Sequence, residues 1–258
     1  MSCVLFEIKD SIAFITLNRP EKFNAFNREM ALLLQEKLDE CQDSKTIRCV
    51  YITGAGKGFS SGQDLQEAAD PKGLDINTIL TEHYNPIVVK IRRLEKPVVA
   101  AVNGVAAGAG ANVAICCDIV VAARSATFVQ AFSNIGLIPD TGGTFFLPRL
   151  IGLQKSIAIS MLADKVTADE AERLGMIYKV FDDDAFKTES INIAQKLSQM
   201  PTKALYFTKK AFNQSFISSL PEQLHDEELL QVRAAGTADF KEGVQAFLEK
   251  RKPVFKGE

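Results

Sequence analysis

The sequence is poor in the residues and runs that mark several specialised classes of protein. It has no tryptophan and only two histidines, His83 and His225. That count argues against a zinc hydrolase, whose metal is held by several imidazole or thiolate groups. No apolar run reaches the length of about 18 residues that a membrane-spanning helix needs. These absences favour a globular chain without a metal ion.

The cysteines and the charge balance narrow the class further. The five cysteines are odd in number and form no Cys-x-x-Cys motif, so we expect buried thiols rather than disulfides. Lys and Arg number 30 against 32 Asp and Glu, a net charge of −2. Neither a nucleic acid nor a membrane is therefore an expected partner. The first residues lack the basic and apolar parts of a signal peptide, which together with free thiols predicts a cytoplasmic location.

The first part of the chain alternates between strand and helix signals. Apolar, β-branched runs at residues 4–8 and 12–17 predict a β-hairpin, and further strands are expected at 49–53, 97–102 and 119–122. The glycine-rich stretch 54–62 is expected to be a loop. This pattern predicts an α/β fold.

Helical spacing of apolar residues becomes dominant from about residue 154. Asn27, Thr167 and Asp239 are predicted N-caps. No Pro- or Ser-rich linker separates the α/β part from the helical end, so we expect the two to be closely associated. Helices are expected at 27–42, 77–94, 156–162, 167–174, 185–198, 202–213, 221–235 and 239–250.

Two glycine-rich stretches resemble nucleotide-binding loops but lack their essential positions. In the run 54–58, Lys57 is followed by Gly58 instead of Ser or Thr, and Ile52 stands where a P-loop needs its first glycine. The run 108–110 lacks the third glycine of a dinucleotide fingerprint. Nucleotide binding is therefore not predicted.

Residues 58–62, Gly-Phe-Ser-Ser-Gly, match the G-x-S-x-G motif of serine hydrolases. Ser60 would be the nucleophile, with His225 or His83 as base and an acid such as Asp118 or Asp140. No HGGG-like oxyanion segment precedes the motif, and both histidines are expected to be solvated or to cap helices. A serine hydrolase is a distant alternative.

The segments 59–65 and 103–112 each place glycines and small residues directly after a strand. Glycine lets a ligand approach the backbone, and N–H groups that open a helix favour negative charge. Two such loops facing each other would supply two donors to one oxygen, which is an oxyanion hole. Tight helix packing explains the same spacing equally well.

The chain resembles the crotonase superfamily, the enoyl-CoA hydratases and isomerases, along nearly its whole length. The resemblance implies a spiral of ββα turns with a helical C-terminal region: a core at 1–195 that holds an acyl-CoA site, and a trimerisation region at 196–258. It implies an acyl-CoA thioester as substrate, assembly as homotrimers or dimers of trimers, and no cofactor beyond the coenzyme A of the substrate. The matching segments are 17–25, 59–65, 96–104, 117–122, 136–144 and 167–177.

The resemblance also implies roles for individual residues. The backbone N–H groups of Gln63 and Ala109 would hold the thioester oxygen, and preorganised donors of this kind stabilise an enolate by several kcal/mol. Residues 68–79 would shape the acyl pocket. The residues expected around coenzyme A are Lys22, Ala25, Ser61, Asp64 and Leu65, and those expected nearer the acyl group are Gly108, Asn112 and Phe132.

Departures from the family pattern point to a subclass. Hydratases of the family activate water with two glutamates, and the matching positions here hold Asn112 and Phe132. An acidic residue, Asp140, stands where several isomerases of the family carry one. A single carboxyl group suits a proton shuttle, acting as base and then as acid. The nearest alternative for the protein is an enoyl-CoA hydratase. The alternative for Asp140 is that it only forms a turn, in which Asp is common.

The segment 132–144 resembles family members that convert ring-1,2-epoxyphenylacetyl-CoA to oxepin-CoA in phenylacetate catabolism. That resemblance also implies movement of a double bond from the 3,4 to the 2,3 position of an enoyl-CoA. Asn112 would orient the substrate or a water molecule, or only cap and pack. The predicted function is therefore an acyl-CoA isomerase in which Asp140 moves a proton beside an oxyanion hole.

Overall fold

The residues described by the computed structural model, 2–68 and 73–258, form two β-sheets. The larger sheet has six strands in the order β1-β2-β3-β5-β7-β10: Val4–Lys9, Ile12–Leu17, Cys49–Gly54, Val98–Val102, Ile119–Ala123 and Lys179–Phe181. The smaller has four in the order β4-β6-β8-β9: Gly58–Ser60, Val105–Ala107, Thr127–Val129 and Lys165–Thr167.

Strand pairing follows the residue pattern of the sequence. β1 and β2 form the predicted antiparallel hairpin, with Lys9 opposite Ile12. The other pairs of the larger sheet are parallel. Every residue of β5, Val98–Val102, is buried, because parallel strands are covered on both faces and therefore consist of continuous apolar runs.

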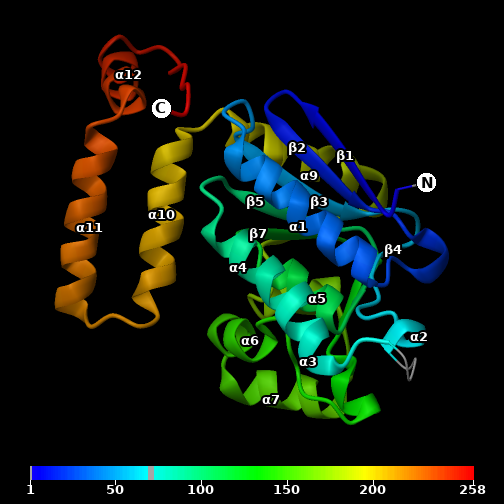
Figure 1. The fold of residues 1–258 in the computed structure, drawn as a ribbon. Helices are drawn as coiled ribbons and strands as arrows, with labels where there is room; N and C mark the ends of the chain where they lie inside the picture. The colour runs from blue at the N-terminus through cyan, green and yellow to red at the C-terminus, as the bar shows by residue number, and fades with distance from the viewer. Residues whose placement is uncertain (1, 69–72) are drawn as a thin grey trace.

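Helices cover both faces of the larger sheet (Figure 1). α1, Arg28–Asp43, lies in front of it in Figure 1 and begins as predicted, with the Asn27 side chain accepting a hydrogen bond from the Met30 N–H at 3.0 Å. α9, Asp183–Ser198, lies behind the sheet, where the Tyr51 hydroxyl on β3 meets Ser190 Oγ at 2.8 Å. The core is thus sealed by one helix layer on each side.

The chain repeats one order of elements. It adds a strand to the larger sheet, then one to the smaller sheet, and then a helical segment: β3-β4 before α2, α3 and α4, β5-β6 before α5, and β7-β8 before α6. This is the predicted spiral of ββα turns. These and the remaining helices are α2 Leu65–Ala68, α3 Ile76–Thr78, α4 Asn85–Arg93, α5 Ala109–Ile115, α6 Gly143–Ile151, α7 Leu153–Leu162, α8 Ala168–Arg173, α10 Thr202–Ser215, α11 Leu220–Ala235 and α12 Ala238–Leu248.

Several sequence expectations need correction. The stretch 54–62, expected as a loop, contains strand β4. The helix expected over 77–94 is interrupted by a π-helical turn at Ile79–Tyr84. That turn buries His83, which was expected to be solvated or to cap a helix.

The predicted N-cap Asp239 is also wrong. The Thr237 side chain caps α12, and Asp239 lies inside the helix with a buried carboxyl group. The carboxylate oxygens of Asp239 accept hydrogen bonds from the N–H groups of Lys256 and Gly257 at 2.7 and 2.8 Å. Asp239 therefore holds the C-terminal tail instead of opening the helix. The Thr167 cap is confirmed.

Helices α10, α11 and α12, residues 202–248, form a helical arm beside the α/β part (Figure 1). Lys209 on α10 is buried and pairs with Asp118 at 2.8 Å, and its Nζ also donates to the Ile91 carbonyl at 2.7 Å. The proposed boundary at residue 195 lies within α9, and the arm itself starts at Thr202. A role of the arm in trimerisation stays a prediction.

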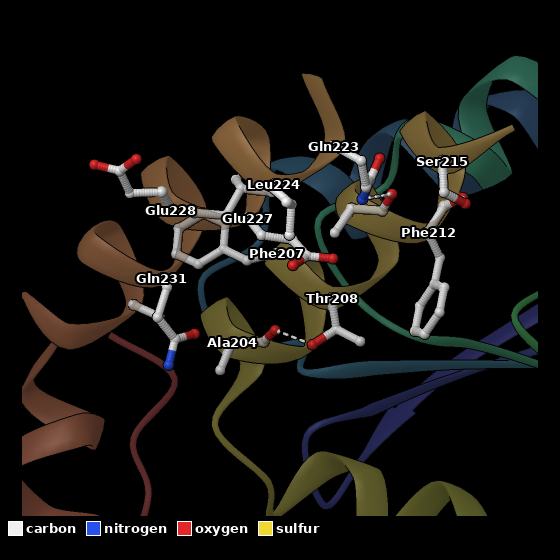
Figure 2. Close-up of a pocket in the computed structure, with 13 residues that line it drawn as sticks. Ala204, Phe207, Thr208, Phe212, Ser215, Gln223, Leu224, Glu227, Glu228 and Gln231 are labelled. Atoms are coloured by element: carbon white, nitrogen blue, oxygen red, sulfur yellow. Dashed lines mark hydrogen bonds between the residues drawn. The ribbon is translucent and has the colours of Figure 1, made fainter. Parts of the chain in front are cut away.

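Figure 2 shows a groove between α10 and α11 in which Phe207 and Thr208 face Leu224 and Glu227. None of the predicted site residues lines this groove. No helix among the described residues has the length and apolar character needed to cross a membrane.

Candidate active site

The two glycine-rich segments meet at one edge of the smaller sheet. β4 and β6 are parallel neighbours, with Ser60 opposite Ala106, so the loops that follow them leave the same edge. Gly62 has φ +89, and a Cβ there would lie 2.8 Å from the Ala107 carbonyl oxygen and 3.4 Å from the Ala109 nitrogen. Only glycine lets the first loop approach the start of α5 this closely.

This contact brings the predicted oxyanion donors, Gln63 and Ala109, into neighbouring loops. The Gly62 carbonyl accepts from the Phe26 N–H at 2.7 Å, and the Asp64 N–H donates to the Phe26 carbonyl at 2.8 Å. Within residues 2–68 and 73–258, the N–H groups of Gln63 and Ala109 donate no hydrogen bond. Ala109 opens α5, where helix geometry leaves N–H groups without an internal partner. Both amides are therefore available to a ligand oxygen.

Tyr84 joins this site without having been predicted from the sequence. Its hydroxyl donates to the Gln63 Oε1 at 2.7 Å, and its ring packs edge-on against Phe26 with centroids 5.8 Å apart. Burial, together with the negative charge of Asp140, raises the pKa of Tyr84 well above its ordinary value. Tyr84 thus remains a neutral donor that fixes the Gln63 side chain.

Asp140 lies next to the first turn of α5. The Asn112 Nδ2 donates to the Asp140 backbone carbonyl at 2.8 Å, and the same carbonyl accepts from the Gly143 N–H at 2.8 Å. The Asp140 carboxylate accepts a hydrogen bond from the Thr141 hydroxyl at 2.6 Å. Asp140 is therefore a turn residue and a candidate acid–base group at once, so the two interpretations of this position are compatible.

The surroundings of Asp140 favour its neutral form. Burial raises the pKa of its carboxyl group, and the hydrogen bond from Thr141 opposes that rise only in part. A carboxyl group of this kind is suited to give a proton back as well as to take one. Of the apolar residues that precede Asp140 in the chain, Phe132 is buried, whereas Ile135 and Leu137 are exposed.

The acyl-side residues are brought together around α5. Gly108 has φ +52 and precedes Ala109, and the Phe132 ring lies 3.8 Å from where a Gly108 Cβ would be. Asn112 is completely buried, one turn further along the helix. Residues 69–72, part of the loop expected to shape the acyl pocket, lie outside the described residues.

The residues expected around coenzyme A lie on two connected turns. Ser61 N–H donates to the Phe23 carbonyl at 2.9 Å, and Ser61 Oγ donates to the Lys22 carbonyl at 3.1 Å. Lys22 Nζ lies on the surface, 2.7 Å from the Gln66 side-chain oxygen. Leu65 is exposed, and Ala25 is buried. A ligand therefore has access to Lys22, Ser61 and Leu65.

Asp64 forms an ion pair with Arg19. Arg19 donates to its carboxylate at 2.8 Å, and the Gln66 N–H donates to the other oxygen at 3.1 Å. Burial opposes ionisation of Asp64, but these hydrogen bonds outweigh it and lower its pKa. Arg19 also donates to the Ala25 carbonyl at 2.5 Å, so the pair joins the two turns that carry the residues expected around coenzyme A.

Replacing Asp64 with asparagine is expected to lower the free energy of unfolding at neutral pH by about 1.5–3 kcal/mol, the usual contribution of a hydrogen bond to a charged group. Because folding lowers the pKa of Asp64, the stabilisation is full above the unfolded-state pKa and disappears as pH falls through the folded-state pKa. Urea unfolding of both proteins between pH 7 and 3 would measure the difference. Glu170→Gln, which breaks an exposed ion pair with Arg173, is the control and should change stability much less. Equal stability of Asp64→Asn and the parent at neutral pH would contradict the prediction.

Ser60 is not placed as a hydrolase nucleophile. Its side chain is buried, and its Oγ donates to the Asn24 carbonyl at 2.8 Å. His83 faces Arg28, with Nε2 3.1 Å from the guanidinium, and burial and the Arg28 charge lower its pKa. His225 is exposed on α11 of the arm. The structure therefore does not bring Ser60 together with a histidine.

Known proteins with similar sequences and folds match this chain over nearly its whole length. The 1,2-epoxyphenylacetyl-CoA isomerase of Escherichia coli (strain K12) is 44% identical over 100% of this chain and 99% of that protein. A probable enoyl-CoA hydratase of Rhodobacter capsulatus is also 44% identical, over 98% of each. The crystal structure of a putative enoyl-CoA hydratase/isomerase from Mycobacterium abscessus matches with a TM-score of 0.94 and 34% identity, over 99% of this chain and 100% of that one. The sequence profile of the family described as enoyl-CoA hydratase/isomerase matches residues 7–258, and the chain belongs to this family of enzymes.

Proposed function

We propose that the protein is an isomerase of acyl-CoA thioesters in which Asp140 moves a proton. The observation that carries the proposal is the absence of a carboxyl group at residues 112 and 132, the two positions at which hydratases of the family hold glutamates. Asn112 uses its amide on the backbone of Asp140, and Phe132 has no polar group. Of the predicted site carboxylates, Asp64 is paired with Arg19, which leaves Asp140 for acid–base work.

The proposed reaction of a 3-enoyl-CoA has two proton transfers. Asp140 removes a proton from C2, and the electron pair moves onto the thioester oxygen to give a dienolate. The N–H groups of Gln63 and Ala109 stabilise that oxygen. The proton then returns to C4, which leaves the double bond between C2 and C3. A single carboxyl group serves both steps, and no water is consumed.

The substrates we propose are 3-enoyl-CoA esters and ring-1,2-epoxyphenylacetyl-CoA, which would give oxepin-CoA. The printed name of the Escherichia coli relative supports the second. We further propose that the enzyme works as a trimer or a dimer of trimers, in keeping with the predicted role of the arm.

An enoyl-CoA hydratase is the second candidate, because the Rhodobacter capsulatus relative bears that name at the same identity. A panel of 3-enoyl, 2-enoyl and ring-epoxide CoA esters, assayed by product mass and ultraviolet absorbance, separates the two. Isomerisation leaves the mass unchanged, whereas hydration adds one water. We expect turnover of at least one ester without change of mass. Hydration of crotonyl-CoA at ordinary enzyme rates, with no isomerisation of any ester, would show the proposal to be wrong.

A further inference from the structure

The turn that carries Asp140 has an unfavourable backbone. Thr141, a buried β-branched residue, has φ +53, and Gly142 follows with φ +77. Left-handed backbone is rare for β-branched residues. Such conformations persist where the surrounding structure holds them, and they are frequent at functional sites. Something must therefore hold residues 140–143 in place.

Two buried amides form a chain of hydrogen bonds that ends on this turn. Gln130 Nε2 donates to Asn112 Oδ1 at 2.8 Å, and Asn112 Nδ2 donates to the Asp140 carbonyl at 2.8 Å. The side chains of Gln130 and Asn112 are 2% and 0% exposed. Gln130 lies between β8 and the 3₁₀ turn Ala131–Ile135, so the chain connects the smaller sheet to the turn.

The direction of this chain is fixed by its last acceptor. The carbonyl of Asp140 can only accept, so Asn112 must present its NH2 group there and its oxygen to Gln130. Gln130 must in turn present its own NH2 group to Asn112. Gly143 packs directly against the Asn112 side chain, since a Cβ at Gly143 would lie 2.9 Å from the Asn112 carboxamide carbon. The two hydrogen bonds together define the orientation of the Asn112 amide.

Gln130 gains nothing else from its amide. Its Oε1 is buried and accepts no hydrogen bond from the described residues. A buried polar atom without a partner destabilises the fold, and an apolar side chain of similar shape would avoid this. Among the described residues, the one hydrogen bond of this side chain is thus the bond to Asn112.

We propose that Gln130 is a positioning residue for the reaction: acting through Asn112, it holds the turn at residues 140–143 so that the Asp140 carboxyl group faces the substrate. The inference rests on the proposed function. It assigns to Asn112 a role in orienting the acid–base group instead of contact with water.

The first test is Gln130→Met, which keeps the size of the side chain and removes the donor. We expect kcat to fall by about 10- to 100-fold, as for a displaced reacting group, with KM changed by less than about twofold because binding contacts are intact. Gln223→Met is the matched control, because the Gln223 Nε2 also makes one hydrogen bond, to the Ala211 carbonyl at 3.1 Å, and its Oε1 is also buried without a partner. Gln223 lies on the arm (Figure 2), and its variant should keep kcat.

The second test uses the fixed direction of the chain. In Gln130→Glu, a protonated carboxyl group still donates to Asn112 Oδ1, whereas an ionised one repels that oxygen. The kcat of this variant should therefore fall with rising pH relative to the parent enzyme, which has no ionisable group at this position. A role that is only structural would not create this pH dependence.

The outcomes separate this inference from the proposed function. Unchanged kcat in Gln130→Met, or the parent pH profile in Gln130→Glu, would overturn the positioning role, even if Asp140→Asn lost most of its activity as expected. Equal losses of kcat, thermal stability and acyl-CoA binding in Gln130→Met would also overturn it, since they indicate a general packing role. Full activity in Asp140→Asn would overturn the proposed function itself.

Discussion

Replacing Asp140 with asparagine is expected to reduce isomerisation by about 10²- to 10⁴-fold, the usual contribution of a positioned acid–base group. Asparagine keeps the shape of the side chain and still accepts the hydrogen bond that Thr141 donates, but it cannot take a proton. The measurements are the rate of double-bond migration in a 3-enoyl-CoA and the exchange of deuterium at C2.

Binding and stability separate loss of chemistry from loss of structure in this variant. Affinity for an unreactive acyl-CoA should remain within about threefold, since uniform binding is not changed. Burial raises the pKa of Asp140, so the ionised carboxyl destabilises the fold at pH values above that pKa. Asp140→Asn should therefore unfold at a higher temperature at neutral pH. The matched control is Asp183→Asn, an exposed residue at the start of α9, which should keep full activity. Deuterium exchange at the parent rate in Asp140→Asn would contradict the assigned role.

The pH dependence of the parent enzyme follows from the same shift. Asp140 must be ionised to take the first proton, and its pKa lies above the ordinary value because partial burial removes water from the carboxyl. Plotted against pH, kcat/KM should therefore rise through this elevated pKa, and the acid limb should disappear from the residual activity of Asp140→Asn.

Removing the Ala109 N–H is the second change with a large expected effect. Ala109→Pro removes this donor and puts the proline Cδ in the place of its hydrogen, and proline is well tolerated at the first position of a helix, where Ala109 stands. We expect a loss of about 10²- to 10³-fold in kcat, as for one oxyanion-hole donor. Steady-state kinetics on a 3-enoyl-CoA would measure it.

Ala238→Pro provides a control of the same kind. Ala238 is the exposed first residue of α12, so the same substitution is made at a helix start outside the candidate site. It should change neither kcat nor KM. If Ala109→Pro retained the parent kcat while its circular dichroism matched that of the parent, the Ala109 N–H would not be a donor to the thioester oxygen.

The order of apolar and polar residues was sufficient to predict the strands with continuous apolar runs and the helices with one clear apolar face. The strands of the larger sheet except β10, and most of the longer helices, were predicted, because each buries a continuous run or one clear face. The smaller sheet was missed, since its strands have three residues each. Runs this short show no clear alternation of apolar and polar residues, and their strand geometry arises only from pairing with distant neighbours.

The residues of the candidate site also divide into those that the sequence predicts and those that it does not. Gln63, Ala109 and Asp140 were predicted as site residues because glycine spacing marked the loops and a family resemblance implied their roles. Tyr84 and Gln130 were not predicted. The hydrogen-bond partners of their side chains lie 21 and 18 residues away in the chain. No local pattern carries that information.

The π-helical turn at Ile79–Tyr84 has a consequence for insertions and deletions. A π turn contains one residue more than the α-helical turn it replaces, and each residue rotates a helix by about 100°. Deleting one residue within 79–82 would restore a regular helix while leaving Tyr84 joined to α4. Everything before the turn, including α3, would then swing around the helix axis. A single extra residue thus sets the direction in which α3 leaves Tyr84, and a change of length here would turn α3 without altering the segment that carries Asp140.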